Sequence, residues 1–164
     1  MPKLPLTPHI EGVLEKAQEL SVVLKRNGVD IDLFFHCFLN DLSLSCSSIL
    51  KKVDIDPKEW LKESRSVLNK KRENKNVRKT IKTDVRKLLT AAAAFAEESF
   101  DLDYIPPEII LMICFDRLHS PKVIKKLYPQ KDKNADMIVL AVIAECSLAV
   151  KDFDIEDLYQ LSLI

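Results

Sequence analysis

His36 and Cys37 are adjacent in the chain, and a cysteine beside a histidine is one arrangement of a thiol nucleophile with its base. That chemistry needs the two side chains in contact and a third group that orients the histidine. Neighbouring side chains in a helix point about 100° apart, so these two cannot easily hydrogen-bond to each other. We therefore interpret Cys37 as a core thiol and His36 as a satisfied or partly exposed imidazole, and we expect no catalytic residue.

The cysteines and glycines argue against two further kinds of site. The four cysteines form no C-x-x-C pair and have no nearby histidine pair to complete a zinc site, so we expect no metal. The two glycines are too few for a glycine-rich loop that binds phosphates, so we expect no cofactor. The sequence begins without the apolar segment of a signal peptide, and its apolar runs are far shorter than a membrane span of about 20 residues. We expect a cytoplasmic protein with reduced thiols and no membrane partner.

A basic stretch, about residues 69–82, separates two apolar halves of the sequence, and its basic character continues to Lys87. The candidate binding residues in it are Lys70, Lys71, Arg72, Lys75, Arg78 and Lys79. A solvated linker is the simpler interpretation; the alternatives are docking onto an acidic patch of a partner or contact with nucleic-acid phosphates. The chain balances 25 Lys and Arg against 25 Asp and Glu, and the stretch offers no aromatic side chain for base stacking. A nucleic-acid-associated helical protein is therefore the alternative function, and nucleic acid is not the partner we expect.

Apolar residues recur with the period of an α-helix along most of the chain, which predicts an all-α fold. The first expected helix begins at Thr7-Pro8 and ends at Asn27-Gly28. Further helices are expected over about 31–39, 46–53 and from Pro57, then from about Thr83, over 106–115, after Ser120-Pro121, from Asn134 to about Val150, and over about 154–163.

The second half repeats the helix order of the first half. In the first helix of each half, Ile10 matches Val85 at an offset of 75 residues. From the second helix onward we aligned the halves at an offset of 74, which pairs Phe34 with Glu108. We predict a single domain of two pseudo-twofold-related four-helix repeats, about 6–68 and 83–150, joined by the basic linker at about 69–82 and followed by a C-terminal helix at about 154–163.

The repeat resembles the N-terminal domain of the Clp family of AAA+ unfoldases. The stretches that carry the resemblance are Leu6-Thr7-Pro8, Val13-Leu14 and Ala17 in the first half, and Leu88-Leu89, Ala92, Tyr104-Ile105 and Glu108–Leu111 in the second. The resemblance implies a domain of about eight helices that is not catalytic and that recognises substrate polypeptides, degradation marks or adaptor proteins for an unfoldase. Since no ATPase module follows in this sequence, we expect a freestanding copy of that domain.

The resemblance also implies where a partner would bind. In some members of the family, a glutamate in each second helix, near the threonine that opens each first helix, binds the guanidinium group of phosphorylated arginine. Carried onto this sequence, the expected peptide- or adaptor-binding residues are Thr7, Phe34, Thr83 and Glu108, and Phe34 replaces the first-copy carboxylate. From the residues alone, the simpler interpretation of Glu108 is an acidic residue that stabilises a helix N-terminus, and that of Phe34 is a core residue.

The function that we expect is therefore a non-enzymatic protein-binding module, an accessory or modulator of a Clp-type protease. The expected partner is a protein or peptide: a Clp-type unfoldase or protease, an adaptor, or a substrate.

Overall fold

The computed structural model describes residues 4–70, 76–116, 118–128 and 142, and every regular element in these ranges is a helix. The helices are α1 (Pro8–Val23), α2 (Ile31–Asn40), α3 (Leu44–Lys52), α4 (Pro57–Asn69), α5 (Thr83–Phe100), α6 (Pro107–Cys114) and α7 (Lys122–Leu127). The prediction of an all-α fold is confirmed. The helices expected from Asn134 and over 154–163 lie outside the described residues.

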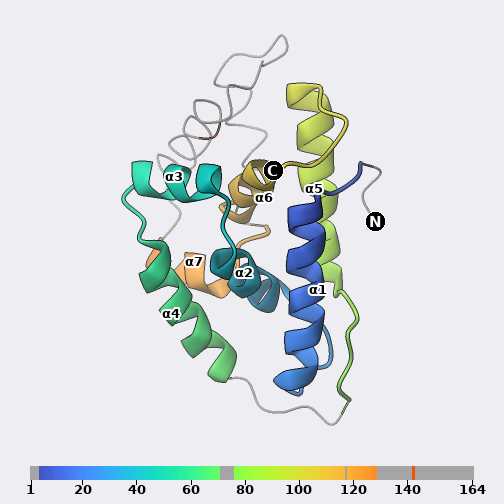
Figure 1. Ribbon diagram of the computed structural model, residues 1–164, viewed down its shortest axis with the longest axis vertical. Helices are drawn as coiled ribbons and strands as arrows, with labels where there is room; N and C mark the ends of the chain where they lie inside the picture. The colour runs from blue at the N-terminus through green and yellow to red at the C-terminus, as the bar shows by residue number, and fades with distance from the viewer. Residues whose placement is uncertain (1–3, 71–75, 117, 129–141, 143–164) are drawn as a thin grey trace.

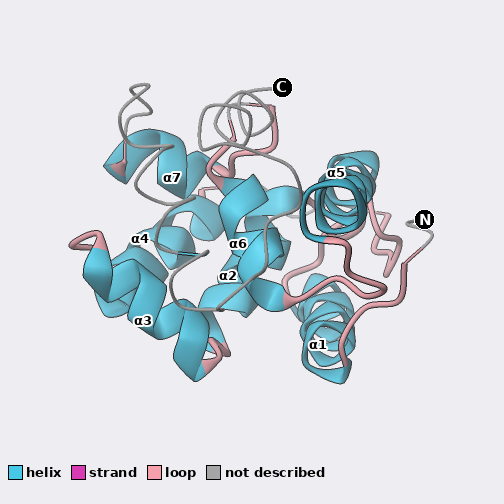
Figure 2. Cartoon of the chain, turned by 90° about the horizontal axis from the view of Figure 1, so that it is seen from above, coloured by secondary structure: helices cyan, strands magenta, loops and turns pink. Residues whose placement is uncertain are grey.

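Helices α2 and α6 lie at the centre of the molecule (Figures 1 and 2). On one side α1 and α5 lie next to each other and run in opposite directions, and α3, α4 and α7 lie on the other side. Helix α1 packs on α2, α5 packs on α6, and α2 also contacts α4 and α5. Because the two central helices are covered in this way, each is apolar around most of its circumference.

The core of α2 is aromatic. Phe34, Phe35 and Phe38 are all fully buried, and the ring of Phe38 lies 6.2 Å from each of the other two rings, centroid to centroid. Burial of three such side chains supplies a large hydrophobic contribution to stability. In the described part of the chain no single helix is long and apolar enough to cross a membrane; α2 and α3 meet that test only when taken together, across a bend of 101°.

The first helix ends earlier than its sequence pattern predicts. Helix α1 ends at Val23, Lys25 adopts a left-handed conformation with φ of 53°, and the N–H of Arg26 donates to the carbonyl of Ser21 at 2.8 Å. Gly28 therefore does not end the helix. Its φ is 147°, and a Cβ atom there would lie 2.7 Å from the carbonyl oxygen of Thr80. The glycine is needed because another segment of backbone passes against it.

Two parallel β-bridges join the copies. Leu6, which precedes α1, pairs with Ile105, which precedes α6; Ile81, which precedes α5, pairs with Val29, which precedes α2. The hydrogen bonds are equivalent too: Ile105 N–H donates to the Pro5 carbonyl at 2.9 Å, and Val29 N–H donates to the Thr80 carbonyl at 2.7 Å. Each copy thus supplies the segment that fixes the start of the other copy's second helix.

These bridges correct the predicted alignment of the second helices. The bridge residues Val29 and Ile105 differ by 76 in number, and so do the first residues of α2 and α6, whereas the sequence alignment used 74. Asp32, the second residue of α2, is therefore the counterpart of Glu108, the second residue of α6. The sequence could not fix this register, because both helices are apolar at nearly every position and can be matched equally well two residues apart.

We predict that Gly28→Ala lowers the free energy of unfolding by roughly 1–3 kcal/mol, because the added methyl group meets the Thr80 carbonyl and the backbone conformation disfavours a side chain. Gly12→Ala is the matched control: Gly12 lies inside α1 with open space at its Cβ position, so this change should add about 0.5–1 kcal/mol. Urea unfolding of both variants measures the effect. Equal effects of the two substitutions would contradict the close approach at Gly28.

Candidate functional site

The structure brings together the starts of α1 and α6, where two of the expected site residues lie. Thr7 follows the bridge residue Leu6. Glu108 lies in the first turn of α6, which begins shortly after Ile105, the residue that pairs with Leu6. Thr7 is the N-cap of α1, and its hydroxyl oxygen accepts a hydrogen bond from the N–H of Ile10 at 3.4 Å. Glu108 is half-buried. This end of the molecule therefore carries one hydroxyl group and one carboxylate at neighbouring helix starts.

The other two expected residues are placed differently. Phe34 is fully buried, which corrects its assignment to a binding surface. Asp32 occupies the position equivalent to Glu108, but it is buried, and its Oδ1 accepts a hydrogen bond from the N–H of Lys122 at 2.8 Å. That carboxylate therefore holds the start of α7 against α2. Thr83 is the exposed first residue of α5 and lies at the second bridge.

The copies also share a pair of pockets, each of about 270 Å³. The pocket between α1 and α2 is lined by Lys16, Glu19, Leu20, Val23, His36, Cys37 and Asn40. The pocket between α5 and α6 is lined by Ala91, Ala94, Phe95, Glu98, Ser99, Ile113 and Asp116. Four lining residues of α1 match those of α5 at an offset of 75. Two of α2, Cys37 and Asn40, match Ile113 in α6 and Asp116 just after it at an offset of 76. The two copies therefore agree in surface shape as well as in helix order.

The chemistry of His36 and Cys37 is that of core residues. The ring Nδ1 of His36 lies 3.0 Å from the hydroxyl oxygen of Ser64, and burial lowers the histidine pKa. Burial raises the pKa of the Cys37 thiol to about 11, so the thiolate form required of a nucleophile is not populated near neutral pH. Within the described residues no group of three His, Cys, Asp or Glu side chains is arranged to hold a metal ion.

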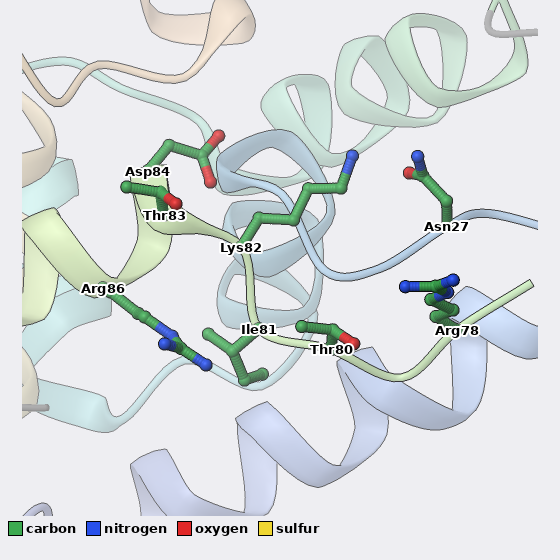
Figure 3. Close-up of a pocket in the computed structure, with 8 residues that line it drawn as sticks. All are labelled: Asn27, Arg78, Thr80, Ile81, Lys82, Thr83, Asp84 and Arg86. Atoms are coloured by element: carbon green, nitrogen blue, oxygen red, sulfur yellow. The ribbon is translucent and has the colours of Figure 1, made fainter.

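A basic cavity of about 480 Å³ lies at the start of α5 (Figure 3). Arg78, Lys82 and Arg86 line it, and the rest of its lining is Asn27, Thr80, Ile81, Thr83 and Asp84. We call Arg78, Lys82 and Arg86, together with this cavity, the basic cradle. Lys82 is the N-cap residue of α5, and its side chain makes no capping hydrogen bond.

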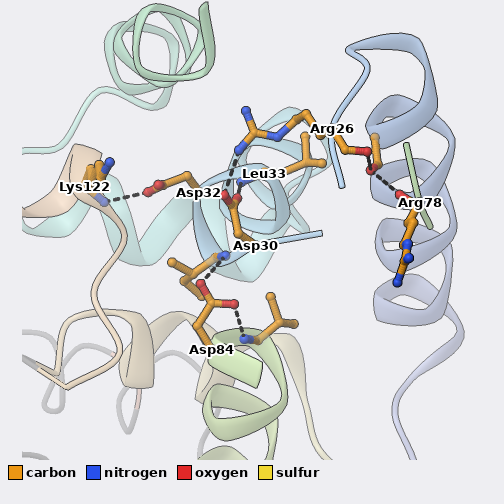
Figure 4. Close-up of polar contacts among 10 residues, drawn as sticks. Arg26, Asp30, Asp32, Leu33, Arg78, Asp84 and Lys122 are labelled. Atoms are coloured by element: carbon orange, nitrogen blue, oxygen red, sulfur yellow. Dashed lines mark hydrogen bonds and ion pairs between the residues drawn. The ribbon is translucent and has the colours of Figure 1, made fainter. Parts of the chain in front are cut away.

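The acidic side chains around the cradle are used in structural contacts (Figure 4). Asp84 Oδ2 accepts a hydrogen bond from the N–H of Ile31 at 3.0 Å, so a residue of the second copy caps α2 of the first. Asp30 Oδ2 pairs with Arg26 Nη2 at 2.7 Å, and both side chains are largely buried. These contacts hold the loop before α2 in place and neutralise Arg26.

The basic stretch is only partly the free linker that the sequence suggests. Lys70 is the exposed C-cap residue of α4, and Lys71, Arg72 and Lys75 lie outside the described residues. The backbone at Arg78 and Lys79 is tied to the first copy: the Arg78 carbonyl accepts from the Ser21 hydroxyl at 2.6 Å, and the Lys79 carbonyl accepts from Gln18 Nε2 at 3.0 Å. Residues 78–82 are therefore part of the packed structure.

Lys82 and Arg86 belong to the basic run that continues to Lys87, but they are not among its six candidate binding residues. The comparison between the copies would have identified them. At an offset of 75, Lys82 takes the place of Thr7, and Arg86 takes the place of Glu11. A neutral residue and an acidic residue of the first helix are both replaced by basic residues in the second, which is a sequence signal independent of any structure.

Comparison with known proteins agrees with the fold. No model of a protein family matches this chain, and no curated protein matches it. A solved structure from a study of the coevolution of the ATPase ClpV, the TssB–TssC sheath and the accessory HsiE protein in two classes of type VI secretion matches with a TM-score of 0.59 and 14% sequence identity. The match covers 94% of this chain and 85% of that chain. At this identity the likeness shows a shared helical fold.

We predict that Lys82→Thr raises the free energy of unfolding by about 0.5–1 kcal/mol, because the backbone at Lys82 (φ −75°, ψ 164°) is nearly that at Thr7 (φ −70°, ψ 155°), where a threonine already caps a helix. The matched change Thr7→Ala should lower the free energy of unfolding by a similar amount. Thermal and urea unfolding of both variants test this. A destabilised Lys82→Thr protein would show that the lysine has a structural role in this fold.

Proposed function

We propose that this chain is a non-enzymatic, cytoplasmic protein-binding domain that docks a polypeptide partner in a Clp-type ATPase system. The partner is a substrate, an adaptor or a subunit of the ATPase assembly. The observation that carries the proposal is the helical fold itself, whose likeness to a chain from the ClpV and sheath study extends over 94% of this sequence. This likeness favours a protein-interaction role in general, without naming the partner.

The surface chemistry supports a docking role. The candidate thiol Cys37 is protonated and the neighbouring histidine is bound to Ser64, so neither is poised for nucleophilic attack. The remaining features are shallow pockets at helix pairs and charged groups at helix starts. Such pockets suit side chains of a polypeptide.

The carboxylates at the second positions of α2 and α6 are the candidate groups to bind one specific ligand, the guanidinium group of phosphorylated arginine. Asp32 is buried and bonded to the backbone of Lys122. Glu108 is half-buried and lies beside the Thr7 end of the molecule. If the chain binds phosphorylated arginine, Glu108 is therefore the carboxylate that receives it.

The test is calorimetric titration of the full chain with a purified Clp-type ATPase, with a purified TssB–TssC-type sheath complex, and with a phosphoarginine peptide whose matched control is the unphosphorylated peptide. We expect saturable binding to at least one protein partner with a Kd of about 1 μM or tighter, equivalent to about −8 kcal/mol. Glu108→Gln should weaken only the phosphoarginine arm, and Glu97→Gln, an exposed position of α5 outside the pockets, serves as its control. No binding in any arm would contradict the proposed function.

A further inference from the structure

The basic cradle holds cations that the described part of the chain leaves without ion-pair partners. No described acidic side chain forms an ion pair with Arg78, Lys82 or Arg86. Asp84 lines the same cavity, but its two carboxylate oxygens accept hydrogen bonds from backbone N–H groups, Oδ2 from Ile31 at 3.0 Å and Oδ1 from Val85 at 2.8 Å. Figure 3 shows the Asp84 side chain on the opposite side of the α5 start from Arg86. The cradle is thus a positive site on a chain of zero net charge.

The backbone that carries the cradle is fixed by the rest of the fold. Arg78 N–H donates to the Arg26 carbonyl at 3.0 Å, and Lys82 N–H donates to the Val29 carbonyl at 2.9 Å. Gly28 allows this close passage, since any larger residue would meet the Thr80 carbonyl. A ligand of the cradle would therefore meet charges on an ordered backbone, and binding would cost less conformational entropy than binding to a free basic tail.

Two of the three cations of the cradle belong to the second copy alone, since the position equivalent to Arg78 at an offset of 75 is Lys3. The positions equivalent to Lys82 and Arg86 in the first copy are Thr7 and Glu11. At these two positions the first helix carries a neutral and an acidic residue on an equivalent scaffold, so the helix does not need these two cations for its stability. Thr7 in fact caps its helix, whereas Lys82 does not. The lysine occupies a position where a threonine would stabilise the helix better.

We infer that the basic cradle binds an acidic segment of a partner polypeptide, a short run of aspartate and glutamate side chains. Charge complementarity carries this choice: arginine forms bidentate hydrogen bonds with carboxylates, and three cations around one cavity suit several neighbouring carboxylates. The inference rests on the proposed protein-binding function and specifies the chemistry of the partner. Nucleic acid fits less well, because the described residues that line the cavity include no aromatic side chain for base stacking and the chain has no excess of positive charge.

The test uses fluorescence anisotropy with a labelled peptide of alternating Glu and Ser, against the same peptide with Gln in place of Glu. The variant is Lys82→Thr combined with Arg86→Glu, which installs the residues that the first copy already carries at these positions. The matched control is Lys51→Thr combined with Lys125→Glu, which makes the same charge change at exposed positions in the last turns of α3 and α7.

We expect the natural chain to bind the Glu peptide in preference to the Gln peptide, with an affinity that falls as salt rises. The cradle variant should bind about tenfold or more weakly, with no lower unfolding midpoint, while the control variant stays within about twofold. Equal binding by the cradle and control variants would overturn the inference. So would tighter, cradle-dependent binding of a single-stranded oligonucleotide, which would assign the site to nucleic acid.

The two proposals can fail separately. If a Clp-type partner binds the natural chain and the cradle variant equally well, the protein-binding function stands and the cradle is not its docking site. If binding of the Glu peptide depends on the cradle but none of the Clp-type partners binds, the cradle is a site for acidic peptides and the Clp-type function is wrong.

Discussion

The exchange of backbone hydrogen bonds between the two copies is the constraint on which the rest of this structure depends. The short segments before α1 and α5 have polar backbone groups that need partners, and each finds them in the loop before the second helix of the other copy. Side chains extend the exchange, because Asp84 of the second copy caps α2 and Asp32 of the first copy holds the start of α7. Neither copy could keep this geometry alone. The four helix starts therefore lie in two pairs, α1 beside α6 and α2 beside α5, and charged side chains lie at both.

A duplicated scaffold of this kind allows one copy to retain structural residues while the other acquires binding residues. At the N-cap position of the first helix, Thr7 caps α1 and Lys82 leaves α5 uncapped with its ammonium group at a cavity. The pocket between α1 and α2 is bordered by Lys16 and Glu19, whereas the equivalent positions in the second copy are Ala91 and Ala94. The two pockets therefore share their shape and differ in their chemistry.

Much of the fold could be predicted from the sequence, because helix periodicity and capping are local. The sequence predicts the starts of α1 at Thr7-Pro8, of α4 at Pro57 and of α5 at about Thr83 in this way. The register of α2 against α6 was missed because a uniformly apolar helix offers no landmark, and Phe34 was placed on the surface as a result. The sequence also did not predict that the backbone of residues 78–82 is held against the first copy. Their partners, such as Ser21 and Val29, lie about 50 residues away in sequence, and charge composition alone resembles that of a free linker.

The most direct test of interlocked copies is amide hydrogen exchange measured by NMR at the two equivalent bridge donors, Val29 and Ile105. If the backbone hydrogen bonds between the copies hold the fold together, the amide hydrogens of both residues should exchange with solvent slowly, at rates close to those of the central helices. The reason is that opening either bridge requires the copies to separate. Exchange of either amide at the rate of an exposed loop, with the central helices still protected, would contradict this account.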